Sequence, residues 1–121
     1  MSAEINYRIT TASLNVSRLT RYSPSGGVLD SAIIHWPAGC NSLVEIFINH
    51  GTNQVLPAPA TGGTQGNLGL ALDDITQPFD INIPVERGAP LEVVVKNHDD
   101  TNPHTISVIL KISSTKTYSG P

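Results

Sequence analysis

Two apolar runs near the end of the chain constrain its fold more than any other feature. Residues 91–97 and 104–112 are rich in Val, Ile and Thr, which suit an extended backbone and crowd a helix. Residues 98–103, between the runs, contain Asp, Asn and Pro, which favour turns. The pattern predicts a β-hairpin formed by the two runs.

Alternation of apolar and polar residues predicts a sheet with one dry face and one wet face. Every second residue from Ile106 to Ile112 is apolar, and most residues between them are polar. Further strand patterns lie at residues 5–9, 14–16, 28–36, 43–50 and 79–83. The 43–50 run and residues 54–56, separated by Gly51, predict another hairpin.

About eight short strands and no helical segment predict an all-β chain. We expect a single antiparallel β-sandwich domain over residues 1–121, either jelly-roll-like or another Greek key. Residues 57–69 are rich in Pro and Gly and are expected to form the longest loop, which is a candidate binding element.

Charge is distributed unevenly along the chain. Of the formal net charge of −3, residues 1–21 carry about +2, from three arginines and Glu4, which leaves about −5 for the remainder. We therefore consider residues 1–21 as either an edge strand or an arm used in assembly. The candidate binding or assembly residues in this segment are Arg8, Arg18 and Arg21.

Composition favours a protein made in the cytosol. Cys40 is the only cysteine, so no internal disulfide can form. The first residues lack the basic start and apolar block of a signal peptide, and no run approaches the roughly 20 apolar residues of a membrane span. The chain is net acidic with dispersed aromatic residues, so we expect neither nucleic acid nor a membrane as a partner.

No motif in the sequence indicates catalysis. Cys40 lacks a nucleophile elbow and is interpreted as a buried structural residue. No pair of carboxylates stands out for glycosidic chemistry, and the glycines at residues 62–66 are not followed by the lysine and helix of a phosphate-binding loop. We expect a protein that is not an enzyme and has no catalytic residues.

Histidines and acidic residues around the 98–103 turn raise the possibility of a metal site. Imidazole and carboxylate groups bind zinc, which makes His98, Asp99 and His104 candidate ligands. Their spacing fits no specific signature, and the aspartate pairs of the chain match no EF-hand loop. We therefore expect no bound metal and no cofactor.

Several motifs occur in an order that resembles a known kind of protein. These are the strings at residues 34–40, 43–51, 54–57 and 97–105. Together they resemble small β-sandwich proteins encoded in the structural gene clusters of phages and archaeal viruses, which look like capsid decoration or turret components. The likeness spans residues 33–112, and the N-terminal segment carries none of it.

The resemblance implies a non-enzymatic virion structural protein that decorates or stabilises a capsid shell. It implies an oligomer on the capsid surface, made in the host cytoplasm, whose partners are copies of itself and a major capsid protein. One alternative is a carbohydrate- or receptor-binding module that uses Trp36, the 57–69 loop and the turn between His98 and His104. Another is a small metal-dependent protein of the cupin or cupredoxin kind.

Overall fold

The computed structural model describes residues 2–57 and 69–113, which form strands and turns without a helix. This confirms the all-β prediction. The strands are β1 (Ser2–Thr11), β2 (Val16–Tyr22), β3 (Gly27–Trp36), β4 (Val44–His50), β5 (Asn53–Leu56), β6 (Ile75–Val85), β7 (Pro90–Asn97) and β8 (His104–Ser113).

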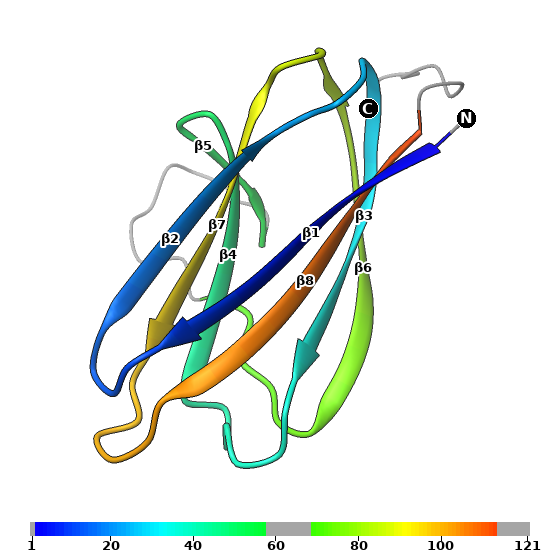
Figure 1. The fold of residues 1–121 in the computed structure, drawn as a ribbon. Helices are drawn as coiled ribbons and strands as arrows, with labels where there is room; N and C mark the ends of the chain where they lie inside the picture. The colour runs from blue at the N-terminus through cyan, green and yellow to red at the C-terminus, as the bar shows by residue number, and fades with distance from the viewer. Residues whose placement is uncertain (1, 58–68, 114–121) are drawn as a thin grey trace, which may run out of the picture.

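The strands form two antiparallel sheets that face each other (Figure 1). Sheet A has the order β1-β8-β3-β6, and sheet B has the order β2-β7-β4-β5. The pairs β1–β8, β2–β7, β3–β6 and β4–β5 are those of one long hairpin rolled up on itself. This winding is a jelly roll, one of the two kinds of topology that the sequence predicted.

The core lies between the two sheets and follows the predicted alternation. Ile106, Val108, Leu110 and Ile112 of β8 have no exposed surface, whereas the residues between them are partly exposed. Apolar side chains of β3 lie beside them in sheet A, and those of β4 and β7 face them from sheet B. Burial of this aliphatic layer is the main force that holds the sheets together.

The prediction that residues 91–97 and 104–112 form a hairpin is wrong. Strand β7 lies in sheet B and β8 in sheet A, so the segment between them crosses from one sheet to the other. The Asn97 side chain supports this crossing, since its Nδ2 donates to the carbonyl oxygens of Thr11 (3.1 Å) and Asn102 (3.0 Å). The same turn residues that close a hairpin here span the roughly 10 Å between packed sheets.

Two other local predictions had different outcomes. Strands β4 and β5 pair as the expected hairpin, with Ile48 opposite Leu56. The strand pattern around residues 14–16 is interrupted, because Leu14 lies in a turn with φ of 57° and is 68% exposed. Its side chain therefore contributes nothing to the core, and β2 begins only at Val16.

Residues 2–22 supply two of the four edge strands of the sandwich. Strand β1 is an edge of sheet A and β2 an edge of sheet B, and the two lie on the same side of the molecule (Figure 1). Pro78 and Pro84 occur in the opposite edge strand β6, and proline blocks the addition of another strand. Strand β1 is long and contains neither proline nor glycine, so its edge has no such protection.

Candidate interaction surfaces

The space between the sheets is filled by the side chains of the core. Among the described residues, the fully buried ones include Trp36 and eight Leu and Ile residues, and these pack in a single cluster with the other core residues. A filled interior leaves the outer faces, the edges and the connections between strands as the places where a partner can bind.

The outer face of sheet B is covered by the chain itself. Phe47 and Val94 lie side by side on this face, yet they are only 8% and 2% exposed. The Lys96 ammonium lies 4.8 Å from the centre of the Phe47 ring. Residues 69–72 form a strap along the edge of β4 beside Phe47, where Leu70 and Ile46 exchange two backbone hydrogen bonds of 2.9 and 3.1 Å.

Glu45 anchors one end of this strap. Its Oε2 accepts a hydrogen bond of 2.7 Å from the Gly69 N–H, and its Oε1 is bonded to Nε2 of His98. Burial raises the pKa of Glu45, but the Gly69 N–H, His98 and Lys96 together lower it by more, so the pKa lies below its usual range. The carboxylate is therefore ionised at neutral pH and holds the strap in place.

The outer face of sheet A has no covering segment among the described residues. Two β-branched side chains, Ile33 and Ile109, lie next to each other on it and remain partly exposed. Beside them, His35 Nδ1 and Thr76 Oγ1 are hydrogen-bonded at 2.7 Å. An apolar centre with polar surroundings on a flat sheet is the usual anatomy of a protein contact surface.

The side of the molecule that carries β1 and β2 combines aromatic and basic groups. Tyr7 is buried, and its hydroxyl donates to the carbonyl oxygen of Leu91 at 2.7 Å. Burial raises the pKa of Tyr7 far above its usual range, an effect that the nearby Arg21 opposes only in part. The Arg21 guanidinium lies 5.8 Å from the centre of the Tyr7 ring. Tyr22, the next residue, is 65% exposed.

The three candidate arginines have different surroundings. Arg8 and Arg21 line one hollow beside β1, and within residues 2–57 and 69–113 neither forms an ion pair. Arg21 also lines a second hollow together with Glu4 and Tyr22. Arg18 is instead 3.2 Å from Glu92 on the outer face of sheet B. The structure thus brings together Arg8 and Arg21 and separates them from Arg18.

The expectation that Trp36 takes part in binding is wrong. Its side chain has no exposed surface, and its indole N–H donates to the carbonyl oxygen of Val44 at 3.2 Å. Its ring meets Phe79 edge to face, with a centroid distance of 6.1 Å. Trp36 therefore closes the core between β3 and β4 and offers no ring face to a sugar.

The candidate metal ligands around the crossing do not converge. His98 is bonded to Glu45, whereas His104 Nε2 lies 2.8 Å from Oδ2 of Asp99. The His104 hydrogen bond, helped by the N–H groups of Thr101 and Asn102, lowers the pKa of Asp99 to about 2. In the part of the chain that the structure describes, no group of three or more His, Cys, Asp or Glu residues is placed to hold a metal ion.

Two further positions complete the survey of reactive groups. Burial raises the pKa of the Cys40 thiol to about 11, and the charges of Asp73 and Asp99 act in the same direction. The thiol is thus protonated at neutral pH, which disfavours a nucleophilic role.

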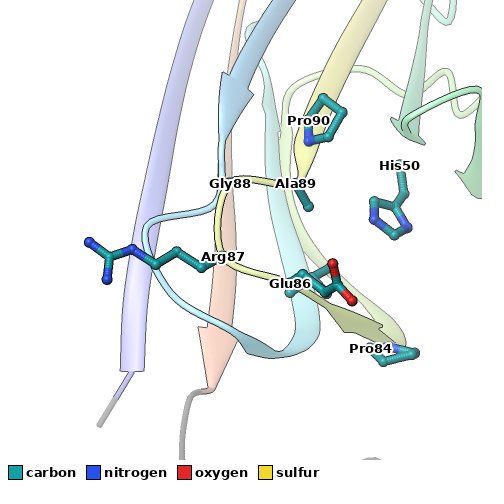
Figure 2. A pocket seen from close by; sticks show the side chains of 8 residues that line it. His50, Pro84, Glu86, Arg87, Gly88, Ala89 and Pro90 are labelled. Atoms are coloured by element: carbon teal, nitrogen blue, oxygen red, sulfur yellow. The ribbon is translucent and has the colours of Figure 1, made fainter.

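At the far end of the sandwich, His50 and Glu86 face one hollow while Arg87 extends away from it (Figure 2).

The 57–69 loop, proposed from the sequence as a binding element, lies largely outside the described residues, which exclude 58–68. No helix in the described ranges is long and apolar enough to cross a membrane. The sequence analysis missed Tyr22, Glu45 and the Ile33–Ile109 contact. Alternation along β1 and β8 indicates which residues face outward, but cross-strand partners depend on the register.

Comparison with known proteins provides no relative from which a function can be transferred. No family model matches the chain, and no curated protein or solved structure is significantly similar to it.

Proposed function

We propose that this chain is a non-enzymatic structural protein of a virion, which decorates or stabilises a capsid shell through repeated contacts between proteins. Its partners would be copies of itself and a major capsid protein, at the capsid surface, after synthesis in the host cytoplasm. The observation that carries the proposal is the contrast between a filled interior and exposed contact surfaces on sheet A and along β1 and β2.

The fold supports this proposal by analogy. Jelly rolls of eight strands occur in viral capsid proteins, in lectins and in cupins. A cupin or a cupredoxin needs histidines that converge on one ion, whereas His98 and His104 are bonded to different carboxylates. A shell protein instead needs a rigid body with contact surfaces on its exterior, which matches the described residues.

The side of the molecule formed by β1 and β2 is the surface that we assign to the capsid partner. Arg21 has no carboxylate partner among the described residues, and Tyr22 beside it is largely exposed. Tyrosine and arginine supply most of the binding energy in many protein interfaces. An acidic patch on the shell would complement Arg21, and repetition over a symmetric lattice multiplies a modest affinity.

The test is co-sedimentation of the purified chain with particles from its source, combined with mass spectrometry of those particles. We expect the chain in the particles and a loss of binding in Arg21→Glu and Tyr22→Ala. Arg87→Glu changes the net charge by the same amount at a residue that lines neither of the hollows containing Arg21, and it should bind normally. Absence of the chain from the particles, together with no binding of the wild type, would refute the proposal.

A second candidate function is a carbohydrate- or receptor-binding module. The observation that favours it is the hollow lined by Glu4, Arg21 and Tyr22, because an exposed aromatic ring beside charged groups suits a sugar. Glycan-array binding that disappears in Tyr22→Ala and persists without any particle would favour this function over the first.

A further inference from the structure

The register of sheet A arranges its outward residues in three rows that cross all four strands. The rows run from β1 through β8 and β3 to β6, and the strands are antiparallel throughout. The central row is Asn6, Ile109, Ile33 and Pro78; one flanking row is Glu4, Lys111, Ser31 and Asp80; the other is Arg8, Ser107, His35 and Thr76.

The central row is the apolar part of this face. Ile33 and Ile109 are paired across β3 and β8 and are partly exposed, and Pro78 at the edge is exposed. A wet face normally carries polar residues at such positions. The matching residues of sheet B, Phe47 and Val94, are nearly buried, and Lys96 and Gly69 lie against the Phe47 ring, but no described segment covers Ile33 and Ile109.

The two flanking rows are complementary in charge at the β1 edge. Glu4 and Arg8 lie on the same face of β1, one on each side of Asn6, and both are exposed. A rotation of 180° about an axis along the central row turns a second copy face to face with the first. The rotation exchanges the flanking rows, so Glu4 of each copy meets Arg8 of the other.

We propose that a second copy of this chain docks on the outer face of sheet A, with a two-fold axis along the central row. Ile33 and Ile109 then pack against their own equivalents, and two Glu4–Arg8 pairs form at the rim. Such an interface is isologous, the commonest arrangement in homo-oligomers. Since packed sheets lie about 10 Å apart, long side chains such as Glu and Arg reach across the gap.

The face is small for the interface of a stable dimer. Four strands about 4.8 Å apart and about ten residues long make a surface of about 600 Å² per copy. Two copies would bury about 1,200 Å² together, which is the lower end for specific interfaces. The dimer should therefore be weak and reversible in solution, and gain strength from repetition in a lattice.

This inference rests on the proposed function and specifies which face joins copies of the chain. In the dimer Arg8 forms an ion pair with Glu4 of the second copy. Arg21 lies on the core-facing side of β2, opposite Leu91, and Tyr22 is at the end of that strand. Neither belongs to the three rows, although both line hollows that adjoin Glu4 or Arg8, so self-association and shell binding depend on different but neighbouring side chains.

Charge reversal tests the proposed pairing in the full-length chain by sedimentation velocity. Arg8→Glu places two carboxylates together at each rim contact, and Glu4→Arg places two guanidinium groups together, so each variant alone should associate at least tenfold more weakly than wild type. An equal mixture of the two variants should restore the dimer, because every contact then joins an arginine and a glutamate. Arg87→Glu should dimerise as the wild type does.

Other results would overturn the inference. A wild type that stays monomeric up to about 1 mM excludes the dimer, and a mixture that stays monomeric excludes the Glu4–Arg8 pairing. Ile109→Lys adds a test of the central row and should also abolish association, with circular dichroism showing that the fold is retained. Particle binding by a strictly monomeric wild type would refute this inference and leave the proposed function standing. Dimerisation without particle association would refute the proposed function and leave this inference standing.

Discussion

The two outer faces of the sandwich differ in how far their central apolar side chains are shielded from water. Each has an apolar pair at the centre, Phe47 and Val94 on sheet B and Ile33 and Ile109 on sheet A. On sheet B the pair is nearly buried, with Lys96 and Gly69 of the strap against the Phe47 ring, whereas on sheet A the pair stays partly exposed. The contrast shows that the chain itself buries the apolar pair of sheet B, whereas the pair of sheet A is suited to burial by a partner.

The largest expected effect comes from removing the covered ring. Phe47→Ala should lower the free energy of unfolding by about 3 kcal/mol, since it removes a nearly buried aromatic side chain and leaves a cavity. Ile109→Ala on the open face should cost about 1 kcal/mol or less in the monomer, because water already reaches that side chain. Urea denaturation of both variants measures the difference, and equal losses would contradict the distinction between the faces.

A methyl group at position 69 should push the strap away from β4 and the Phe47 ring. A Cβ on Gly69 would lie 2.8 Å from Cβ of Glu45 and 2.9 Å from the Phe47 ring. Gly69→Ala should therefore cost about 1–3 kcal/mol and speed hydrogen exchange of the Leu70 and Ile46 amides.

Gly26→Ala is the matched control for this substitution. A Cβ on Gly26 meets no atom closer than 3.7 Å, so its stability should change little. Normal exchange at Leu70 and Ile46 in Gly69→Ala would show that the strap does not depend on this close approach.

Acid should weaken the crossing that joins the closed face to the open one. The pKa of Asp99 is about 2 in the folded chain, against about 3.9 in an unfolded one. Its stabilisation is therefore complete above about pH 4 and is lost as the pH falls toward about 2. The urea midpoint should drop over this range in the wild type.

Asp99→Asn should start from a lower urea midpoint at neutral pH and show a flatter acid dependence. Asp100→Asn is the matched control, because Asp100 is exposed and the Asp99–His104 bond is retained in that variant. An acid dependence in Asp99→Asn as steep as that of the wild type would assign the effect to other carboxylates.

The smallest effect should come from the ion pair on the rim of the covered face. Arg18 has a side chain that is 59% exposed, and its partner Glu92 also accepts a hydrogen bond of 3.0 Å from Asn49. Arg18→Ala should therefore cost no more than about 0.5 kcal/mol, as exposed pairs usually do. A loss above about 1 kcal/mol in urea denaturation would mean that Arg18 also takes part in covering Val94.

Much of the fold could be predicted from local pattern, and the errors have a common cause. Alternation in β8 correctly separates the buried Ile106 from the exposed positions, because successive side chains of a strand point to opposite faces. The same pattern cannot distinguish a hairpin from a crossing, since both need two strands and a turn. Asn97 contributes to the crossing through the carbonyl of Thr11, a residue that is distant in the sequence.

The candidate site was predictable only in part for the same reason. The excess of arginine in residues 1–21 is visible in the sequence, but only the pairing of β1 and β2 with different strands shows that Arg8 and Arg21 line one hollow while Arg18 pairs with Glu92. Trp36 was misassigned because a tryptophan before a proline is compatible with either a surface or a core position. The hydrogen bond from its indole N–H to the Val44 carbonyl and the contact of its ring with Phe79 place Trp36 in the core.

The sequence alone determines that this chain forms strands, which side of most strands is apolar, and that a single sandwich results. Those properties follow from backbone preference and from side-chain periodicity, which act over a few residues. Only the tertiary structure decides which strands are neighbours, which apolar pair is covered, and that Glu4 and Arg8 flank a shared apolar row. Register and strand order depend on the free energy of contacts between segments that are distant in the sequence. A local sequence pattern does not indicate that free energy.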